Sequence, residues 1–560
     1  MQKTTARDFD FEKHEQSFWA QQAWWMGPPA VFILTVVLTV MSFPPFHTPE
    51  FAYVFASPLV FWALTRPDFK KFALVALAAQ VVSWVVILWW LHNVTWAGLF
   101  LLGPFVGVWI GVWYLALWWT ARRVHEKPFA VRAAGMLGLA GLWVVIEWTR
   151  TWLLGGFPWL PLGASQWQRA VLLQIASFTG QGGISFVLMT FNFGFAAYFH
   201  RLFNKKYSGL RRRSPEFELA AFVLLVPLAV FFLTALQHRS ERYARVALVQ
   251  PDIPQSVKWN QAYADMSLDA LGKLTMASVF TAPELVIWPE AAPPYAIKGW
   301  QDSDQIRKWV ENLAARAKTP LLIGSVASED AARADDTVYN GAFVIDPAQG
   351  GLQAGGYKKR RLVPFGEFVP LRFLLGWLSK VSDAPGGDVQ PGNSAAPLLV
   401  KTRTGMVAAG MLICYEDIFP NLAVANVYAG ADSQIVITNN GWFGEGGAAY
   451  QHAAHSVLRA VETRRPVIRC GNSGWSGWID EYGHIRGVMT SNAGTIYYRG
   501  TQTFDVMRDP DWAGRDSFYT QHGDWFVLVS ATLAFLGYTM AQFYKPRDHT
   551  PPTYAETVTT

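Results

Sequence analysis

Residues 407–417 read V-A-A-G-M-L-I-C-Y-E-D, an apolar run that ends at Cys414 and continues at once into polar and acidic residues. Two other apolar runs are also followed or flanked by polar residues. One closes on Glu290 in L-V-I-W-P-E (285–290), and the other borders Lys359 in Y-K-K-R-R-L-V-P-F-G-E (357–367). A base, a fixed cation and a sulfur nucleophile are the parts that acyl transfer through a thioester needs. We therefore take Glu290, Lys359 and Cys414 as candidate catalytic residues.

Each candidate also has a plainer interpretation. A single cysteine is most often an inert core residue, which fits Cys470 between V-I-R and G-N-S-G. Glu290 could be a surface turn carboxylate, although Trp288 beside it could desolvate the carboxylate. Charge runs are usually solvated, but strand alternation would turn Lys359 inward with Tyr357 and Arg361, and leave Lys358 and Arg360 outward. The three candidates together carry more weight than any one of them.

Around these residues the sequence predicts an α/β domain over 238–515. Continuous apolar runs such as A-R-V-A-L-V-Q, P-L-L-I-G-S-V, N-G-A-F-V-I-D, S-Q-I-V-I-T-N and P-V-I-R-C are separated by turns. Helical patterns fall near 261–280, 302–317, 418–429 and 449–464. Such strands alternating with helices indicate sheets covered on both faces, in an α/β or layered αββα arrangement. The segment 371–380 (L-R-F-L-L-G-W-L-S-K) is apolar at close to helical spacing, as in a core helix or an arm lying on a membrane.

Residues outside this domain are strongly apolar. The chain has 560 residues, 51% of them hydrophobic, with 27 Trp, and Trp is enriched at membrane interfaces. We expect about eight transmembrane helices, near 27–43, 50–65, 72–92, 96–120, 130–149, 182–202, 217–237 and 524–543. The predicted organisation is therefore a cytoplasmic segment 1–26, a transmembrane domain 27–237, the α/β domain, a C-terminal transmembrane helix 524–543 and a cytoplasmic tail 544–560.

Charge placement predicts the orientation. Lys and Arg cluster after the second, fourth and sixth spans, whereas the segments P-P-F-H-T-P-E and H-N-V-T after the first and third contain none. The positive-inside rule then puts both termini in the cytoplasm and 238–515 on the opposite side. The polar N-terminus lacks the pattern of a cleavable signal peptide. The net charge of +6 is spread over these short loops, which argues against nucleic-acid binding.

Other polar features have modest interpretations. Glu147 and Arg150, three apart at the end of the fifth span, predict an intramembrane ion pair, with a substrate contact as the alternative. His452 and His455 are read as polar helix residues, because no further metal ligands lie nearby. No cofactor or metal motif is present, and both Cys414 and Cys470 are expected to be free thiols.

The chain also resembles a known family. The strings that carry the likeness are V-Q-P-D-I-P-Q-S-V-K-W (249–259), V-I-W-P-E, Y-K-K-R-R-L-V-P-F-G-E-F-V-P, I-C-Y-E, T-N-N-G-W-F-G (438–444), Q-H-A-A-H-S-V-L-R-A-V-E-T-R-R-P (451–466), N-S-G-W-S-G (472–477), F-P-P-F (43–46) and E-W-T-R…G-G-F-P-W (147–159). They resemble the nitrilase superfamily, and within it the membrane-bound apolipoprotein N-acyltransferase branch, over about residues 27–545. Asn440-Gly441 stand where this branch usually has Asp-Ala, and Arg361 where His is common.

The resemblance implies an αββα sandwich with Glu290 as general base, Lys359 as oxyanion stabiliser and Cys414 as nucleophile. It implies supporting roles for Glu367, Tyr415 and Glu416, and substrate-binding roles for Trp259, Asn439 and Trp442. The expected enzyme is a monomer of the bacterial inner membrane whose catalytic domain faces the periplasm. It moves the sn-1 acyl chain of a phospholipid to the N-terminal amine of a diacylated lipoprotein. The alternatives are a membrane-tethered amidase or nitrilase with a small substrate, and a non-catalytic membrane scaffold.

Overall fold

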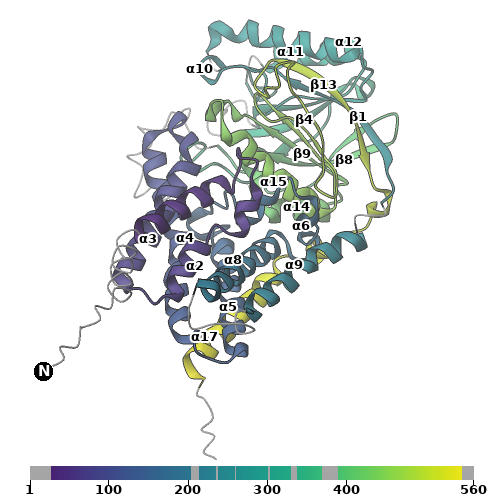
Figure 1. The fold of residues 1–560 in the computed structure, drawn as a ribbon. Coiled ribbons are helices and arrows are strands. Elements are labelled where there is room, and N and C mark those ends of the chain that lie inside the picture. The colour runs from purple at the N-terminus through teal and green to yellow at the C-terminus, as the bar shows by residue number, and fades with distance from the viewer. Residues whose placement is uncertain are drawn as a thin grey trace, which may run out of the picture.

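The structure is a computed structural model that describes residues 27–203, 213–234, 238–258, 260–300, 303–329, 337–368 and 389–544. Two parts lie one above the other in Figure 1. The upper part contains two β-sheets between two layers of helices, and the lower part is a bundle of apolar helices. The predicted combination of a helical membrane part and an αββα sandwich is therefore confirmed.

The first sheet of the sandwich has the strand order β13-β1-β2-β3-β4-β5, with β6 beside β4. Its strands β1, β2 and β3 are parallel, and β4 and β13 are antiparallel to their neighbours. The bounds are β1 Glu241–Gln250, β2 Leu285–Ile287, β3 Leu321–Ser328, β4 Val338–Asp346, β5 Gly351–Leu352, β6 Tyr357–Lys358 and β13 Gly500–Arg508.

The second sheet has the order β12-β11-β10-β9-β8-β7, with β8, β9 and β10 parallel. Its bounds are β7 Leu398–Lys401, β8 Met406–Ile413, β9 Ser433–Thr438, β10 Val467–Gly471, β11 Gly477–Ile479 and β12 Ile485–Val488. Every residue of β9 is buried, as expected for a strand covered on both faces. The space between the sheets is filled by side chains such as Leu248, Ile287, Ile413 and Ile437.

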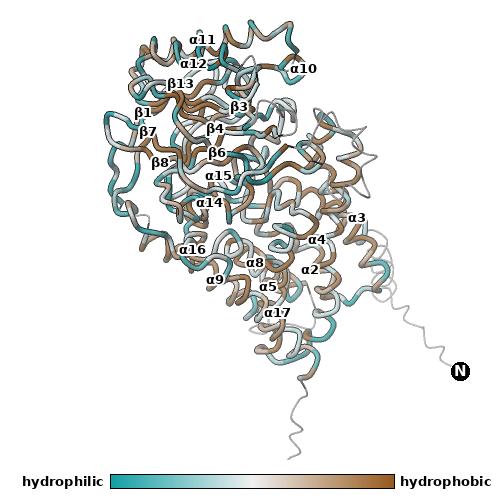
Figure 2. The backbone as a smooth tube through the Cα atoms, turned by 180° about the vertical axis from the view of Figure 1, so that it is seen from behind, coloured by the Kyte–Doolittle hydropathy of each residue, from teal (hydrophilic) through white to brown (hydrophobic). Residues whose placement is uncertain are grey.

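Helices close both outer faces of the sandwich (Figures 1 and 2). The first sheet is covered by α11 (Ala264–Val279) and α12 (Ser303–Ala317), and the second by α14 (Pro420–Tyr428) and α15 (Gly447–Thr463). On α12 the residues Ile306, Val310, Leu313 and Ala314 recur at helical spacing and are buried. By contrast α15 is buried along nearly its whole length, because it lies between the second sheet and the bundle.

The bundle contains six helices that are long and apolar enough to cross a bilayer, judged by length and composition over the described residues. They are α3 Phe69–Ile87, α4 Trp96–Val124, α5 Phe129–Thr149, α8 Gln181–Phe203, α9 Pro215–Thr234 and α17 Trp525–Phe543. Figure 2 shows the hydrophobic colour along α5, α9 and α17. The expected count of eight is not confirmed, because Gly27–Met41 and Pro49–Leu64 are apolar but only 10–17 residues long.

The last helix returns the chain from the sandwich to the bundle. Helix α17 packs on α5 so closely that a Cβ atom at Gly141 would lie 2.3 Å from the Ser530 carbonyl oxygen, and one at Gly138 would lie 3.0 Å from Gly537 Cα. Small residues that let helix backbones approach are typical of packing within membranes. Both ends of the sandwich are thus tied to the same bundle.

Candidate active site

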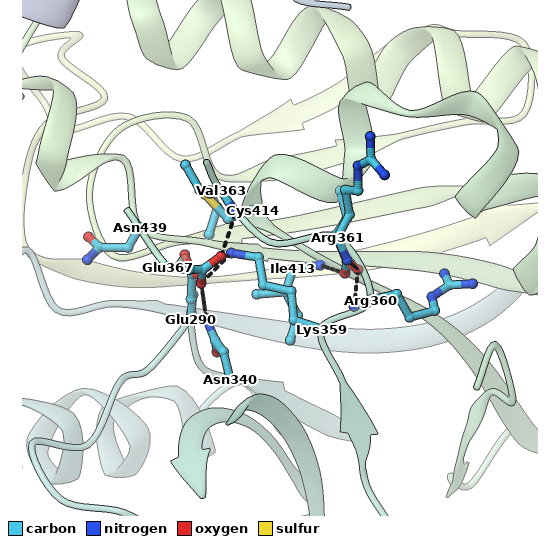
Figure 3. Close-up of polar contacts among 12 residues, drawn as sticks. Glu290, Asn340, Lys359, Arg360, Arg361, Val363, Glu367, Ile413, Cys414 and Asn439 are labelled. Atoms are coloured by element: carbon cyan, nitrogen blue, oxygen red, sulfur yellow. Dashed lines mark hydrogen bonds and ion pairs between the residues drawn. The ribbon is translucent and has the colours of Figure 1, made fainter. Parts of the chain in front are cut away.

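Glu290, Lys359 and Cys414, far apart in the sequence, lie together in the structure (Figure 3). Each directly follows a strand: Glu290 comes after β2, Lys359 after β6 and Cys414 after β8. The Lys359 ammonium Nζ lies 3.2 Å from Glu290 Oε1. The three residues are 7%, 1% and 8% exposed, respectively. The apolar-to-polar boundaries in the sequence therefore mark strand ends that meet in one buried site.

The backbone at Cys414 is strained. Its φ is 52°, in the left-handed region that costs a residue with a side chain about 1–2 kcal/mol. Cys414 begins the short 3₁₀ helix η10 (Cys414–Ile418), so the chain turns sharply where the strand ends. Two contacts hold this turn: the Glu416 carboxylate accepts the Ile413 N–H at 2.7 Å, and His452 Nε2 lies 3.1 Å from the Cys414 carbonyl oxygen. Strain of this kind is often found where a reacting side chain must project from a strand.

Two residues complete the polar surroundings of Lys359. Glu367 Oε1 lies 2.9 Å from Lys359 Nζ, as expected of a supporting carboxylate, and its other oxygen accepts the Val363 N–H at 2.8 Å. Asn340 on β4 donates to Glu290 Oε1 at 2.8 Å and to Glu367 Oε1 at 3.4 Å. Asn340 thus joins the two carboxylates, and the sequence analysis did not identify it.

The charges of the site determine where its protons lie. Burial, and next the Glu290 charge, raise the pKa of the Cys414 thiol to about 12, although Lys359 acts in the opposite direction. Burial alone would raise the pKa of Glu290, but Lys359, Lys258 and the Asn340 bond outweigh it and lower that pKa. Burial opposes a charge on Lys359, yet Glu367 and Glu290 prevail and raise its pKa. The resting site is a thiol beside a carboxylate and an ammonium.

Glu416 ties the strand that ends at Cys414 to the loop that carries Lys359. Besides Ile413, its carboxylate accepts the Tyr357 hydroxyl at 2.7 Å and the backbone N–H groups of Arg360 and Arg361 at 2.6 and 3.0 Å. All four donors come from the segments that present Cys414 and Lys359. Glu416 therefore sets the relative position of these two residues without itself lying between them.

The expected binding residues have different surroundings. Asn439 is buried, accepts a bond from Asn472 Nδ2 at 3.1 Å and donates to Gln255 Oε1 at 2.8 Å, so it supports neighbouring loops. Trp442 is 43% exposed on the 3₁₀ helix η11 (Asn440–Phe443). Trp259 and the segment 371–380 lie outside the described residues.

The histidines of α15 are part of a buried network beneath Cys414. His452 contacts Asp417 Oδ1 at 2.8 Å, and Asp417 Oδ2 accepts from Ser456 at 2.7 Å and from Arg469 at 2.5 Å. His452 and His455 lie on a helix, as predicted, but both are buried, and His452 is part of this network. Its position was not evident from sequence, because the contact to the Cys414 carbonyl depends on how α15 packs against the second sheet.

A loop of the bundle contacts both catalytic segments. The Tyr415 hydroxyl donates to the Gly156 carbonyl at 2.8 Å, and Arg361 donates to the Gly155 carbonyl. Gly156 has a φ of 81°, and a Cβ there would lie 2.4 Å from the Thr151 carbonyl oxygen. Arg361, expected to point inward beside Lys359, instead reaches this loop and is partly exposed, whereas Tyr357 and Lys359 are buried as predicted.

In place of the predicted ion pair, Glu147 and Arg150 make separate contacts to the segment after α5, and Glu147 also contacts α8. Glu147 accepts the Leu162 N–H and the Ser185 hydroxyl, both at 2.7 Å. Arg150 donates to the carbonyls of Phe157 at 3.2 Å and Trp159 at 2.5 Å. The two charged groups thus hold the irregular backbone after α5, which needs such partners at membrane depth.

The two cysteines have distinct environments. Both are free thiols, as predicted. Cys470 is fully buried between the sheets, and its sulfur lies 3.4 and 3.3 Å from the carbonyl oxygens of Val249 and Ile287. It matches the core interpretation, and only Cys414 lies beside Glu290 and Lys359.

Comparison with known proteins places this geometry in a family. A carbon-nitrogen hydrolase model matches residues 245–542, and a model of the apolipoprotein N-acyltransferase N-terminal domain matches 35–194. An apolipoprotein N-acyltransferase of Geobacter metallireducens is 33% identical over 535 residues, which cover 90% of this chain and 94% of that relative. The chain belongs to the apolipoprotein N-acyltransferase family. Members from Chlorobaculum tepidum and Brucella melitensis are 31% and 29% identical over 88% and 86% of this chain, and over 92% and 95% of their own lengths.

Family membership and the six apolar helices together make the chain a membrane protein with a nitrilase-superfamily domain. Within the described residues, no group of three or more His, Cys, Asp and Glu side chains is placed to hold a metal ion.

Proposed function

We propose that this chain transfers an acyl chain from the sn-1 ester of a phospholipid, through a thioester on Cys414, to the α-amine of a diacylglyceryl-cysteine at the N-terminus of a lipoprotein. The observation that carries the proposal is the buried group of Cys414, Glu290 and Lys359 directly above a bundle of apolar helices. The relatives named apolipoprotein N-acyltransferase support the acyl acceptor.

In the first half-reaction the Cys414 sulfur attacks the ester carbonyl carbon while Glu290 takes the thiol proton. Because the pKa of Cys414 is raised and that of Glu290 is lowered, the proton moves as the carbon–sulfur bond forms rather than before it. Lys359 and a backbone N–H stabilise the oxyanion, and loss of one such donor typically costs ~10²–10³ in rate. The oxyanion then collapses and the ester carbon–oxygen bond breaks. The oxygen of the departing lysophospholipid takes the proton that Glu290 held.

In the second half-reaction the lipoprotein amine attacks the thioester carbonyl. Glu290 accepts a proton from the attacking nitrogen, Lys359 again stabilises the oxyanion, and the carbon–sulfur bond breaks. The proton returns from Glu290 to the Cys414 sulfur, and the amide product leaves. Exclusion of water from the buried site favours the amine over hydrolysis. The two substrates thus react in turn, in a ping-pong order.

Glu367, Tyr415 and Glu416 have supporting roles in this scheme. Glu367 holds Lys359 beside Glu290, and Glu416 holds the segments that carry Lys359 and Cys414. We assign substrate-binding roles to Trp259, Asn439 and Trp442. We assign the enzyme to the bacterial inner membrane as a monomer, with residues 238–515 in the periplasm and 1–26 and 544–560 in the cytoplasm. Fusion of alkaline phosphatase after residue 300 should be active, and fusion after residue 125 inactive; the reverse pattern would refute this orientation.

Two other functions make different predictions. A membrane-tethered amidase or nitrilase would form a thioester with a small soluble amide or nitrile, and would release the acid to water. A non-catalytic scaffold would form no covalent adduct. The strained backbone at Cys414 and its buried base and cation favour an enzyme over a scaffold.

The deciding experiment is mass spectrometry of the purified full chain after incubation with phospholipid. We expect one added acyl mass on Cys414, which disappears when a diacylated lipopeptide is added as N-acyl product forms. Cys414→Ala should abolish both products. Cys470→Ala is the matched control, because it removes the other thiol from the core and should retain them. Absence of the acyl mass on the wild-type chain, under conditions in which cell extract N-acylates the lipopeptide, would refute the proposal.

A further inference from the structure

Lys258 is a second buried ammonium of the site, and the mechanism above does not use it. It ends the short helix α10 (Gln255–Lys258) and is only 2% exposed. Its Nζ donates to the Glu290 backbone carbonyl at 3.1 Å. A lysine is almost never fully buried unless charged or polar partners hold it there. Its location therefore demands a reason connected with Glu290.

The position of Lys258 is fixed by the loop that precedes it. Asn472 donates to the Ile253 carbonyl at 2.8 Å and accepts the Ile253 N–H at 3.3 Å. Gln255, at the other end of α10, accepts a bond from Asn439 at 2.8 Å. These contacts tie α10 to the loops after β9 and β10, so the ammonium is held beside Glu290 by the second sheet.

The backbone that receives this bond is itself unusual. Ala291, directly after Glu290, has a φ of 45° in the left-handed region. On the other side, a Cβ at Gly324 would lie 2.4 Å from the Pro289 carbonyl oxygen and 2.7 Å from Glu290 Cα. The turn that presents the Glu290 carboxylate is therefore packed closely on β3 and anchored at its carbonyl by Lys258.

The charges of Lys359, Glu290 and Glu367 do not balance, and a second cation can offset the difference. Lys359 contacts two carboxylates, Glu290 and Glu367. Counted formally, these three residues carry one excess negative charge, which opposes the formation of a thiolate or an oxyanion. The Lys258 charge acts on both Glu290 and Cys414, so its ammonium offsets that excess.

We propose that Lys258 is a positioning residue that anchors the Glu290 turn and supplies a second positive charge, which favours negative charge on the Cys414 sulfur as its proton moves to Glu290. This inference rests on the proposed role of Cys414 as nucleophile. The charges of Glu290 and Cys414 act on Lys258, and Lys359 contacts Glu290 and Glu367.

The test measures the rate at which iodoacetamide alkylates Cys414 in the detergent-purified full chain, read by peptide mass spectrometry between pH 6.5 and 9.5. An opposite charge nearby typically shifts a thiol pKa by ~1–3 units, so Lys258→Met should slow alkylation about tenfold at pH 6.5. Burial lowers the pKa of Lys258 to about 8, so the wild-type advantage should shrink towards unity by pH 9.5. Lys258→Arg, which keeps its charge, should match the wild type at pH 6.5 and exceed it at pH 9.5.

The matched control is Lys273→Met on α11, where the lysine is exposed and paired with Asp269 at 2.7 Å. Its alkylation profile should equal that of the wild type. A purely structural role for Lys258 would slow alkylation by the same factor at every pH, and equal rates for Lys258→Met and wild type would likewise overturn the inference. If Lys258→Met does not fold, Lys258→Gln takes its place in the experiment. The plot of alkylation rate against pH must then still change slope near pH 8 for the wild type, and must not do so for Lys258→Arg.

Failure of the inference and failure of the proposed function give different results. Alkylation reports the thiolate of Cys414 and needs neither phospholipid nor lipoprotein. Retention of N-acylation by Cys414→Ala would refute the function, whereas a pH-independent effect of Lys258→Met would refute only the role of Lys258.

Discussion

The Glu416→Gln substitution tests whether one buried carboxylate holds the nucleophile and the lysine in register. Glu416 is fully buried and accepts four bonds, two on each oxygen: Arg360 and Arg361 N–H on Oε1, and Ile413 N–H and the Tyr357 hydroxyl on Oε2. Glutamine keeps one accepting oxygen and replaces the other with an NH₂ group. The Tyr357 hydroxyl can rotate to accept, but the Ile413 N–H then faces a donor.

The expected cost follows from these contacts. A buried N–H left without an acceptor costs about 1–3 kcal/mol, and the remaining bonds lose the extra strength of a charged acceptor, about 1 kcal/mol in all. The sum of about 3 kcal/mol corresponds to a fall in apparent Tm of roughly 5–10 °C. Relief of the donor–donor contact moves Ile413, and Cys414 with it, away from Lys359. A displacement of 1 Å at a reacting group can cost ~10²-fold in rate.

The assay combines thermal unfolding, followed by tryptophan fluorescence in detergent, with the rate of acyl-Cys414 formation. Tyr357→Phe is the matched control, because it removes one donor and leaves the carboxylate and its three N–H bonds, at an expected cost near 1 kcal/mol. If Glu416→Gln unfolds within 1 °C of the wild type and acylates Cys414 within twofold of its rate, Glu416 does not set the register of the two segments.

Three further predictions concern other parts of the site. Asn340→Ala should slow thioester formation about 10–10²-fold, because it removes a hydrogen bond to the Glu290 carboxylate. Asn340→Asp should slow it further, because its negative charge repels that carboxylate. Equal rates for the two variants in a single-turnover assay would contradict this. Gly156→Ala should lower stability by about 1–3 kcal/mol, because Gly156 has a φ of 81° and a Cβ there would meet the Thr151 carbonyl. Gly155→Ala should cost less in the same unfolding experiment, because the Cβ position of Gly155 is open space. Burial lowers the pKa of His452, and it lowers the pKa of His455 well below its usual range, so at low pH the unfolded chain takes up protons that the folded chain does not. The free energy of unfolding should therefore be highest above about pH 7 and fall as the pH drops through ~6.5. A His452→Gln, His455→Gln double variant should show a flatter dependence of apparent Tm on pH.

The sequence was most informative where a strand ends. Cys414 and Glu290 follow apolar runs that had to be buried strands, and the polar residues after them marked the ends of these strands. The two strands belong to different sheets of the sandwich, so their meeting in one site depends on how the sheets pack. The inward orientation of Lys359 followed from strand alternation with Tyr357. The same reasoning failed for Arg361, because Lys359 still bonds to β4 through its backbone N–H, whereas the N–H groups of Arg360 and Arg361 turn to the Glu416 carboxylate.

Residues whose roles depend on packing could not be found in this way. Asn340 lies in the middle of β4, without any boundary in the sequence, and contacts Glu290 only because β4 and the turn after β2 converge. His452 reaches the Cys414 carbonyl because α15 packs under β8, and Lys258 reaches Glu290 through a turn fixed by Asn472. In the bundle, apolar composition predicted transmembrane helices near 27–43 and 50–65. The structure has apolar helices at Gly27–Met41 and Pro49–Leu64, but both are shorter than the six helices that are long enough to cross a bilayer.

The contacts of Gly155 and Gly156 have a consequence for the dependence of catalysis on the lipid environment. Their loop leaves the top of α5, whose apolar length of 21 residues fixes its depth in a bilayer, and it is bonded to Tyr415, the residue directly after the nucleophile. The height of the sulfur above the hydrocarbon region is therefore set by helix length, whereas the height of a lipid ester is set by bilayer thickness. Activity in vesicles should consequently be highest at one bilayer thickness, and should fall when the acyl chains of the lipids are made shorter or longer.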